Sequence, residues 1–291
     1  HRSPGVFFDH DKGKTHASGK LLFNCRIIPN RGSWLDFEYD AKDFLYFRID
    51  RKRKLPITTL LLAIGYQRKE ILELFYDFKI FSFDKEKEKW QTKFDFNDYK
   101  KPSKLRDDLI SNEGKKVLKK GSKINFVIAK KLFDEGLKHI LVTSDFFIGK
   151  YVKNDLVMPI TKEVFVKSGS QIAQEDLDKI LEQNIDTLTI ANIDPINKGS
   201  YLIDTLNLDK NSSKEEAIND IYRVLRPGEP PSFDIAKEIF KNLFFSSNRY
   251  DLSDVGRVKM NSRLNQQCSD KITILRNDDI IAIVHKMLDL R

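Results

Sequence analysis

The sequence predicts an α+β protein in which a mixed body of strands and helices is interrupted by a small, internally duplicated, β-rich module. Three observations predict this class. Strand patterns fill the first 50 residues, a strand–turn–helix–strand pattern occurs twice in the middle, and apolar residues at helical spacing dominate the last third. The chain has 291 residues, 40% of them hydrophobic, which suffices for a sizeable core.

Strands dominate the prediction for the first 50 residues. Apolar residues at 5–8 predict an opening strand, and the polar run at 9–14 predicts a turn after it. Apolar or alternating stretches bounded by turn residues predict three more strands, at 21–28, 34–40 and 44–49.

Two helices are predicted after Pro56. Thr58 or Thr59 is expected to cap the first, which continues through residues 60–64. The second spans about 69–76, and its apolar residues share one side of the helix: Ile71, Leu72 and Phe75.

The middle of the chain contains a repeat with an offset of 48 residues. The charged run at 84–89 predicts a hairpin turn or exposed loop ahead of it. The two copies, at about 114–142 and 162–190, each read as strand, Gly-Ser turn, short helix and strand. Gly136 and Asn184 occupy the same place after the helix, where both tolerate a left-handed C-cap. This agreement supports a duplicated unit with its own core.

The last third predicts helices. Ser212 or Ser213 with Glu215 or Glu216 forms a capping pattern ahead of the first of them. The Pro- and Gly-rich stretch at 226–231 ends that helix. A second helix is expected to start at Ser232 or Asp234, and a last one after residues 277–279. The side chains predicted to face inward on the second helix are Ile235, Ile239, Leu243 and Phe244.

The positive charge is concentrated near the N-terminus. The chain carries a formal net charge of +8, and the first 75 residues hold 14 Lys and Arg against 9 Asp and Glu. This segment includes the run Arg51–Lys54. Such a region can attract phosphates, although a lone basic run is more often a solvated loop. Charge therefore permits nucleic acid as a partner without requiring it.

The sequence contains no complete catalytic or metal-binding motif. The stretch Gly13–Thr15 lacks the earlier glycine of a phosphate-binding loop, because that position is Phe8. An Asp-x-Asp pattern at Asp9 lacks the carboxylate that closes a calcium loop. No histidine has zinc-ligand spacing, Cys25 lies in an apolar strand where a buried, inert thiol is expected, and no apolar run is long enough to cross a membrane. No catalytic residue and no metal ligand are predicted.

Several stretches together closely resemble the bacterial RNA polymerase beta subunit, in family order and at both ends of the chain. They are His1–Phe8, Asp11–His16, Arg31–Glu38, Arg48–Pro56, Tyr222-Arg223 with Arg226–Pro231, Asn242–Phe245, Arg249–Ser253 and Val255–Arg257. The resemblance implies the lobe, with the edge of the protrusion, for residues 1–76 and 200–291. It implies a lineage-specific insertion for residues 77–199, similar to small barrel- or sandwich-like modules. The start at His1, without an initiator Met, is expected from a cut inside a longer protein.

The resemblance also implies a function. The chain is expected to belong to a DNA-directed RNA polymerase, a nucleotidyltransferase, and to be inactive by itself. The Mg²⁺-binding aspartates of the family lie in the other large subunit, so no cofactor is expected in this chain. The implied partners are DNA (the downstream duplex and the non-template strand), the beta-prime, alpha and omega subunits, and a sigma factor. A cytoplasmic, nucleoid-associated location is expected, with no membrane contact.

The candidate DNA-binding residues are Arg2, Trp34, Arg51, Lys52, Arg53, Lys54, Arg223 and Arg249. Arg2 and Trp34 match family positions near the unpaired non-template base. An indole can stack on an unstacked base, and a guanidinium can pair with phosphate. The alternatives remain open: Trp34 packs in the core, part of the basic run is structural because a strand alternates its faces, and Arg223 or Arg249 pairs with Glu229 or Asp251.

A second hypothesis for the function belongs to a different class. The chain could act mainly as an interaction scaffold whose insertion docks transcription regulators, with DNA contact incidental. The two hypotheses differ in where the functional surface lies, on the basic first segment or on the insertion.

Overall fold

The computed structural model describes residues 3–15, 18–194 and 199–291, which divide into two compact units. The first unit comprises residues 1–71 and 200–291, and the second comprises residues 72–199. Helices and strands are mixed in both, so the predicted α+β class is confirmed.

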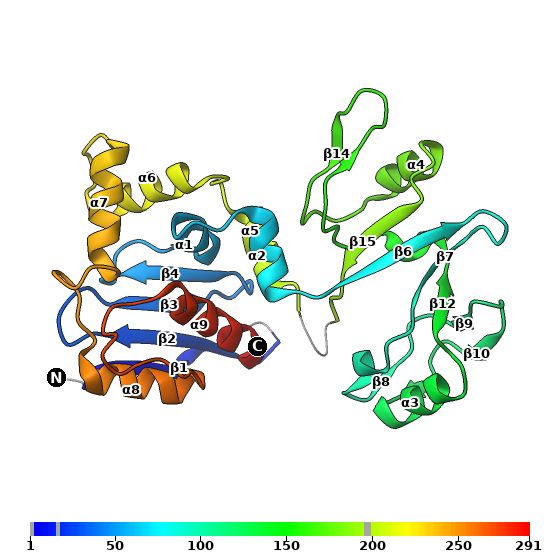
Figure 1. The fold of residues 1–291 in the computed structure, drawn as a ribbon, viewed down its shortest axis with the longest axis horizontal. Coiled ribbons are helices and arrows are strands. Elements are labelled where there is room, and N and C mark those ends of the chain that lie inside the picture. Colours follow the sequence, from blue (N-terminus) through cyan, green and yellow to red (C-terminus); the bar gives the residue numbers. More distant parts are fainter. Residues whose placement is uncertain (1–2, 16–17, 195–198) are drawn as a thin grey trace. The chain divides into compact units, whose positions relative to one another are not determined.

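The first unit contains a five-stranded antiparallel sheet in sequence order (Figure 1). Cys25, Phe37 and Phe47 lie opposite one another on adjacent strands and are buried. The predicted strands are therefore confirmed. The strands are β1 (Gly5–Thr15), β2 (Leu21–Ile28), β3 (Leu35–Tyr39), β4 (Leu45–Ile49) and β5 (Leu55–Pro56).

The turn predicted at 9–14 is wrong. These residues extend β1, where His10 pairs with Phe23 and Thr15 pairs with Leu21, with a register shift between the two pairs. A strand ladder is held by backbone hydrogen bonds, so polar residues can continue it past the edge of the core. The polar composition indicated an exposed segment but not its conformation.

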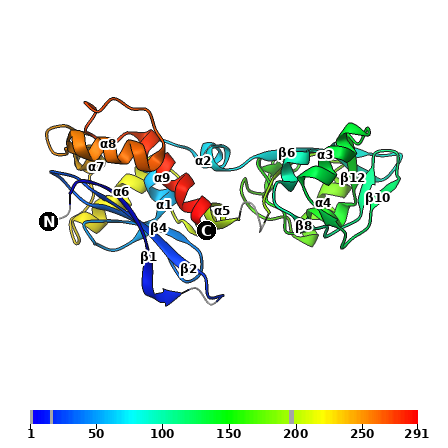
Figure 2. The ribbon, with the colours of Figure 1, turned by 90° about the horizontal axis from the view of Figure 1, so that it is seen from below.

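Seven helices are described in or at the border of the first unit. They are α1 (Ile57–Ala63), α2 (Arg68–Phe75), α5 (Tyr201–Leu208), α6 (Lys214–Leu225), α7 (Phe233–Phe244), α8 (Ser253–Leu264) and α9 (Asn277–Leu290). Figure 2 shows α8 and α9 on one side of the sheet. The Tyr39 hydroxyl donates to the Met287 carbonyl over 2.9 Å, which fixes α9 against the apolar face. This leaves the opposite side chains of β2–β4 as the charged face of the sheet.

The helix caps differ in part from the predictions. Ser213 caps α6 and accepts from the Glu216 N–H, as one of the two predicted alternatives. Thr58 and Thr59 do not cap α1, because both lie buried in its first turn and donate to one oxygen of Asp209. The two hydroxyls therefore bind a distant carboxylate and do not cap the helix, although the local sequence favours a cap.

The inward face of α7 also differs from the prediction. Ile235 is 54% exposed, whereas Ala236, Phe240 and Phe244 are buried. These three residues are spaced by four, and the helix rotates to bury the two aromatic rings in preference to Ile235. Helix α8 was not predicted, because most of its residues are polar and its apolar residues show little periodicity.

The second unit contains a six-stranded sheet in the order β10-β9-β12-β7-β6-β15 and two short ribbons, β11-β8 and β13-β14. No closed barrel forms among its described residues. Its strands are β6 (Phe78–Asp84), β7 (Lys89–Lys93), β8 (Ser103–Lys104), β9 (Leu109–Ser111), β10 (Lys116–Leu118), β11 (Lys123–Ile124), β12 (His139–Val142), β13 (Leu156–Val157), β14 (Val164–Val166) and β15 (Thr187–Ala191). Its helices are α3 (Phe126–Asp134) and α4 (Gln174–Glu182), with short 3-10 turns at Phe96–Tyr99 and Ser144–Phe147.

The duplication is visible in the backbone. Gly121 and Gly169 both have positive φ in their turns, and so do Gly136 and Asn184 after the helices, which confirms the predicted C-caps. Each copy supplies most of one hydrophobic cluster, the first around Ala129 and the second around residues such as Ile172 and Ile180. The predicted hairpin turn at 84–89 joins β6 to β7.

Candidate nucleic-acid interface

The charged face of the five-stranded sheet begins with two ion pairs. Arg26 Nε lies 2.6 Å from Asp36 Oδ1, and Arg48 Nε lies 2.6 Å from Glu38 Oε1. Arg26 pairs with Asp36 across β2 and β3, and Asp36 pairs with Arg48 across β3 and β4. Alternation along each strand places these side chains on the face opposite the buried Phe37.

Trp34 lies at the edge of this face, immediately before β3. Its N–H donates to Asp50 Oδ1 over 2.8 Å, and the Asp50 N–H donates back to the Trp34 carbonyl over 3.0 Å. The guanidinium carbons of Arg26 and Arg51 lie 5.4 and 5.5 Å from its ring centroid. These distances suit cation–π contacts. The indole is half-buried, covered in part by charged side chains, and does not lie in the apolar core.

The basic run forms a tight turn and a short loop, so the predicted strand alternation within it is wrong. The Lys52 N–H donates to the Ile49 carbonyl, and Asp50 and Arg51 have φ of 49° and 59°. Positive φ at both central residues is typical of a type I′ turn. The turn therefore brings Arg51 over Trp34.

Two lysines of the run make structural contacts. Lys52 Nζ donates to the Leu225 carbonyl at the end of α6 over 3.1 Å, and Lys54 Nζ lies 4.3 Å from the Tyr46 ring centroid. A cation near the last carbonyls of a helix stabilises its C-terminus. The expectation that part of the run is structural is confirmed for these two residues.

An open groove joins the turn to the end of α6. It is lined by Lys52, Arg53 and Arg223, together with the loop at 227–230. Arg53 and Arg223 are exposed, and neither makes an ion pair with a residue that the structure describes. Glu229 accepts instead from the Tyr222 hydroxyl over 2.9 Å, a hydrogen bond that raises the pKa of Tyr222. The structure thus brings together three of the predicted residues, two of them with free guanidinium groups.

The remaining two candidates lie apart from this groove or outside the described residues. Arg2 is among the residues that the structure does not describe. Arg249 lies in the loop before α8, exposed, and makes no ion pair with Asp251, whose carboxylate accepts from the Ser253 N–H. The Arg249 carbonyl lies 3.1 Å from the position of a Cβ at Gly32, so its loop packs on the turn that leads to Trp34.

Sequence reasoning missed Arg26, which both contacts the indole and carries a fixed ion pair. The pairing register of β2 and β3 would have indicated this contact. Once Ile27 pairs with Leu35, Arg26 and Trp34 become diagonal neighbours on one face, within reach of long side chains. The strands were predicted, but their register was not.

In the described part of the chain, His, Cys, Asp and Glu side chains do not gather in groups of three that could hold a metal ion. Cys25 is buried, and this burial raises the pKa of its thiol, as expected of an inert cysteine. Within the described ranges, no helix has the length and apolar character needed to span a bilayer.

The sequence of the chain matches a known protein family. The sequence profile of RNA polymerase Rpb2, domain 2, matches residues 2–101 and 186–291, which is more than half of the chain. The chain belongs to the RNA polymerase Rpb2 domain 2 family. Every strand of the five-stranded sheet and the whole of α6–α9 lie within the match.

Relatives of the Rpb2 domain 2 family extend the likeness across the whole chain. It is 47% identical to the DNA-directed RNA polymerase subunit beta of Caulobacter vibrioides strain NA1000 / CB15N, 49% to that of Rickettsia prowazekii and 46% to that of Agrobacterium fabrum. Each alignment covers 100% of this chain but only 21% of the relative. The chain therefore spans about a fifth of the length of these relatives, and the resemblance to beta subunits is confirmed.

Proposed function

We propose that this chain is the lobe of an RNA polymerase beta subunit and that it holds DNA through Trp34 and the neighbouring cations. The observation that carries the proposal is a partly exposed indole with the Arg51 guanidinium over its ring, beside a loop whose Arg53 lines a groove with Arg223. Relatives named as beta subunits of DNA-directed RNA polymerase support it. The polymerase assembly would supply the Mg²⁺ and the catalytic residues.

The two arginines near Trp34 have different roles in this proposal. Arg26 is held by Asp36 at 2.6 Å and keeps its side of the indole in place. Arg51 is exposed and makes no ion pair with a described residue, so it can move to a phosphate and uncover the ring. A base that is unpaired during DNA opening then stacks on the indole, while Arg53 and Arg223 bind phosphates in the groove.

The partners follow from membership of the assembly. We propose contacts with the downstream duplex and the non-template strand, in an enzyme that also contains beta-prime, alpha and omega subunits and binds a sigma factor. The chain by itself would not synthesise RNA, because the catalytic carboxylates belong to another subunit. In this proposal the protein works in the cytoplasm, on the nucleoid.

The experiment is Trp34→Ala in an intact polymerase, with the half-life of the open promoter complex measured at fixed salt. One lost stacking contact is worth ~1–3 kcal/mol, so the half-life should fall by roughly tenfold. Trp34→Phe should retain part of the effect. Elongation on a preformed RNA–DNA scaffold should change little, since bond formation is left to other residues.

A matched control is available on the same face. Tyr46 is another half-buried aromatic with a cation over its ring, so Tyr46→Ala removes a similar side chain away from the proposed stacking site. An equal loss of half-life in Tyr46→Ala and Trp34→Ala would indicate a general packing defect. An unchanged half-life in Trp34→Ala, with the subunit folded, would refute the stacking role.

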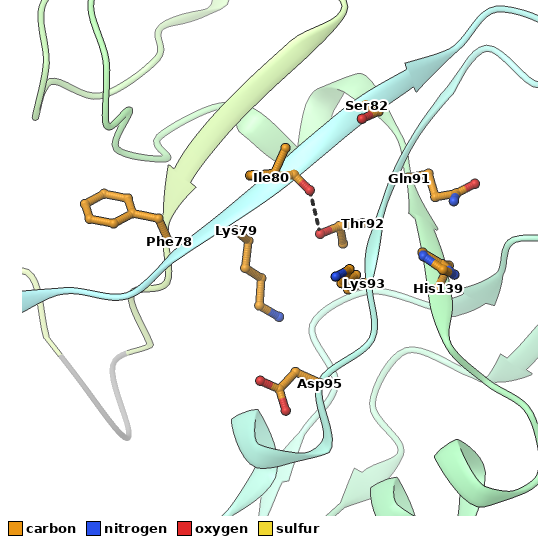
Figure 3. Close-up of a pocket in the computed structure, with 9 residues that line it drawn as sticks. All are labelled: Phe78, Lys79, Ile80, Ser82, Gln91, Thr92, Lys93, Asp95 and His139. Atoms are coloured by element: carbon orange, nitrogen blue, oxygen red, sulfur yellow. Dashed lines mark hydrogen bonds between the residues drawn. The ribbon is translucent and has the colours of Figure 1, made fainter. Parts of the chain in front are cut away.

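A second candidate function, the interaction scaffold, is favoured by one observation in the second unit. Ile80 is 62% exposed on β6 and borders a depression of about 480 Å³ with Lys93 and His139 (Figure 3). The Thr92 hydroxyl donates to the Ile80 carbonyl over 2.9 Å, so the backbone there is fixed. If Ile80→Lys abolishes the effect of a regulator while Trp34→Ala leaves the open complex unchanged, the scaffold is favoured.

A further inference from the structure

The two copies in the second unit share a backbone but differ in charge. Residues 100–138, which hold the first copy, carry twelve Lys and Arg against five Asp and Glu. The equivalent residues 148–186 of the second copy carry five against seven. Because the fold is the same, the charge difference is not needed to build the unit. It indicates that the first copy has a task that the second lacks.

Five of the twelve Lys and Arg residues of the first copy lie on or beside one ribbon. Lys104 of β8 lies directly opposite Lys123 of β11, and both side chains are exposed. The turn before β11 packs on the same ribbon, because the Gly121 N–H donates to the Leu105 carbonyl over 2.8 Å. We call the resulting set the lysine ribbon: Lys104, Arg106, Lys119, Lys120 and Lys123. None of the five makes an ion pair with a described residue.

The like-charge pair is unfavourable for folding. Like charges directly opposite across an antiparallel ribbon are destabilising. The second copy shows that this fold does not require them, because Tyr151 and Gln171 form the equivalent bridge. An anion bound between the two ammonium groups would relieve the repulsion.

The two carboxylates within the ribbon's own segments leave most of its charge uncompensated. Asp108 is already engaged by Lys116 Nζ at 3.2 Å and by the Lys120 N–H at 2.7 Å, a hydrogen bond that lowers the pKa of Asp108. Asp107 is exposed and is the one other carboxylate within the two segments that form the ribbon, 104–108 and 119–123. Within these two segments, five cations therefore accompany Asp107, which makes no ion pair with a described residue, and Asp108, which Lys116 already engages.

We propose that the lysine ribbon is a second nucleic-acid surface, which binds the phosphate backbone without reading sequence. Lysines are depleted in the cores of protein–protein interfaces, and the five side chains include no large apolar anchor, so an acidic protein fits less well. Neutralising phosphates releases counterions, which favours binding to a dense row of lysines. The surface lies in the second unit and does not depend on the role proposed for Trp34.

The test uses the full 291-residue chain and a fluorescein-labelled 30-base-pair duplex of arbitrary sequence. Binding is followed by fluorescence anisotropy between 0.05 and 0.3 M KCl, about the range where phosphate contacts dominate the salt dependence. Lys104→Gln/Lys123→Gln removes the facing pair. Lys167→Gln/Lys179→Gln removes two exposed lysines of the second copy and is the matched control.

We expect Lys104→Gln/Lys123→Gln to lose affinity for the duplex and Lys167→Gln/Lys179→Gln to retain it. Each lost phosphate contact reduces the slope of log K against log salt by about 0.9, so the slope should fall by roughly two and the affinity at 0.1 M salt by at least about tenfold. The control pair should stay within about twofold. Asp107→Asn should increase the affinity, because it removes the opposing charge from the surface.

Folding of the variant is checked in the same preparation. Removing the facing ammonium groups should leave Tm unchanged or raise it, since a repulsion is lost. Two results would overturn the proposal. One is an equal slope of log K against log salt for Lys104→Gln/Lys123→Gln and Lys167→Gln/Lys179→Gln. The other is a DNA affinity that neither Asp107→Asn nor Lys104→Gln/Lys123→Gln changes. Polyglutamate that competes for the ribbon more strongly than a duplex of equal charge would assign the surface to an acidic protein and overturn it as well.

Discussion

Asp279→Ala should destabilise the first unit severely, because it leaves the Arg257 guanidinium buried without its counter-ion. Both side chains are 0% exposed. Arg257 donates to the two carboxylate oxygens of Asp279 over 2.8 and 2.9 Å, and to the carbonyls of Ile272 and Ile274 over 2.6 Å each. The pair ties α8 to α9 and to the segment between them.

The magnitude follows from burial and from the bonds that are lost. Removing one partner of a buried ion pair costs about 3–5 kcal/mol, since the remaining charge is uncompensated. Asp279 also accepts from the Arg276 N–H over 2.9 Å, which places the estimate toward the upper end. For a unit of this size the loss corresponds to a fall in Tm of roughly 10 °C.

Thermal and urea unfolding of the chain, followed by circular dichroism, measure this loss. Asp279→Asn keeps the volume and one acceptor, so its loss should be smaller. Arg257→Met/Asp279→Leu should cost less than the sum of the two single variants, because no charge stays buried, although two carbonyls lose a donor. A loss below about 1 kcal/mol for Asp279→Ala, or strict additivity in the double variant, would refute the reasoning.

Two further predictions concern a backbone position and a buried phenol. Gly32→Ala should lower the stability of the first unit by about 2 kcal/mol or more, because φ is +127° and the new Cβ would lie 2.7 Å from the Tyr250 ring. Urea unfolding measures this loss of stability. An unchanged unfolding midpoint would contradict the close contact with Tyr250. Desolvation, with smaller contributions from Asp98 and Asp194, raises the pKa of Tyr99 to about 12 from 10.0. The folded state therefore binds this proton more tightly, so its contribution is complete below pH 10 and is lost as pH rises toward 12. Tyr99→Phe should flatten the alkaline decline in unfolding free energy by up to about 3 kcal/mol, and an unaltered decline would show that another group titrates.

The arginines of the first unit differ in whether a carboxylate already occupies the guanidinium group. Arg26, Arg48 and Arg257 are all held by carboxylates, whereas Arg53 and Arg223 make no ion pair with a residue that the structure describes. A paired guanidinium must break an existing bond before it binds phosphate. The free pair in the groove is therefore the cheaper source of phosphate contacts in the first unit.

The sequence by itself determined the class and most of the elements. Period-2 and period-3.6 patterns act over a few residues, so β2–β4 and α9 were predicted from local side chains alone. The duplication was predicted for the same reason. Gly136 and Asn184 signal a helix end through their own backbone preferences, which do not depend on distant contacts. The family likeness was equally readable, because the matching segments lie in order along the chain.

Only the tertiary structure decided which of the predicted cations are free and which are used. Lys52 and Arg53 are adjacent and chemically similar, yet one caps α6 and the other lines an open groove. Their difference comes from the position of α6, which lies more than 150 residues later in the chain. Likewise, Trp34 meets Arg26 through strand register and Arg51 through a left-handed turn. Register, helix rotation and long-range ion pairs are set by the packing of the whole unit, and for this reason no local pattern encodes them.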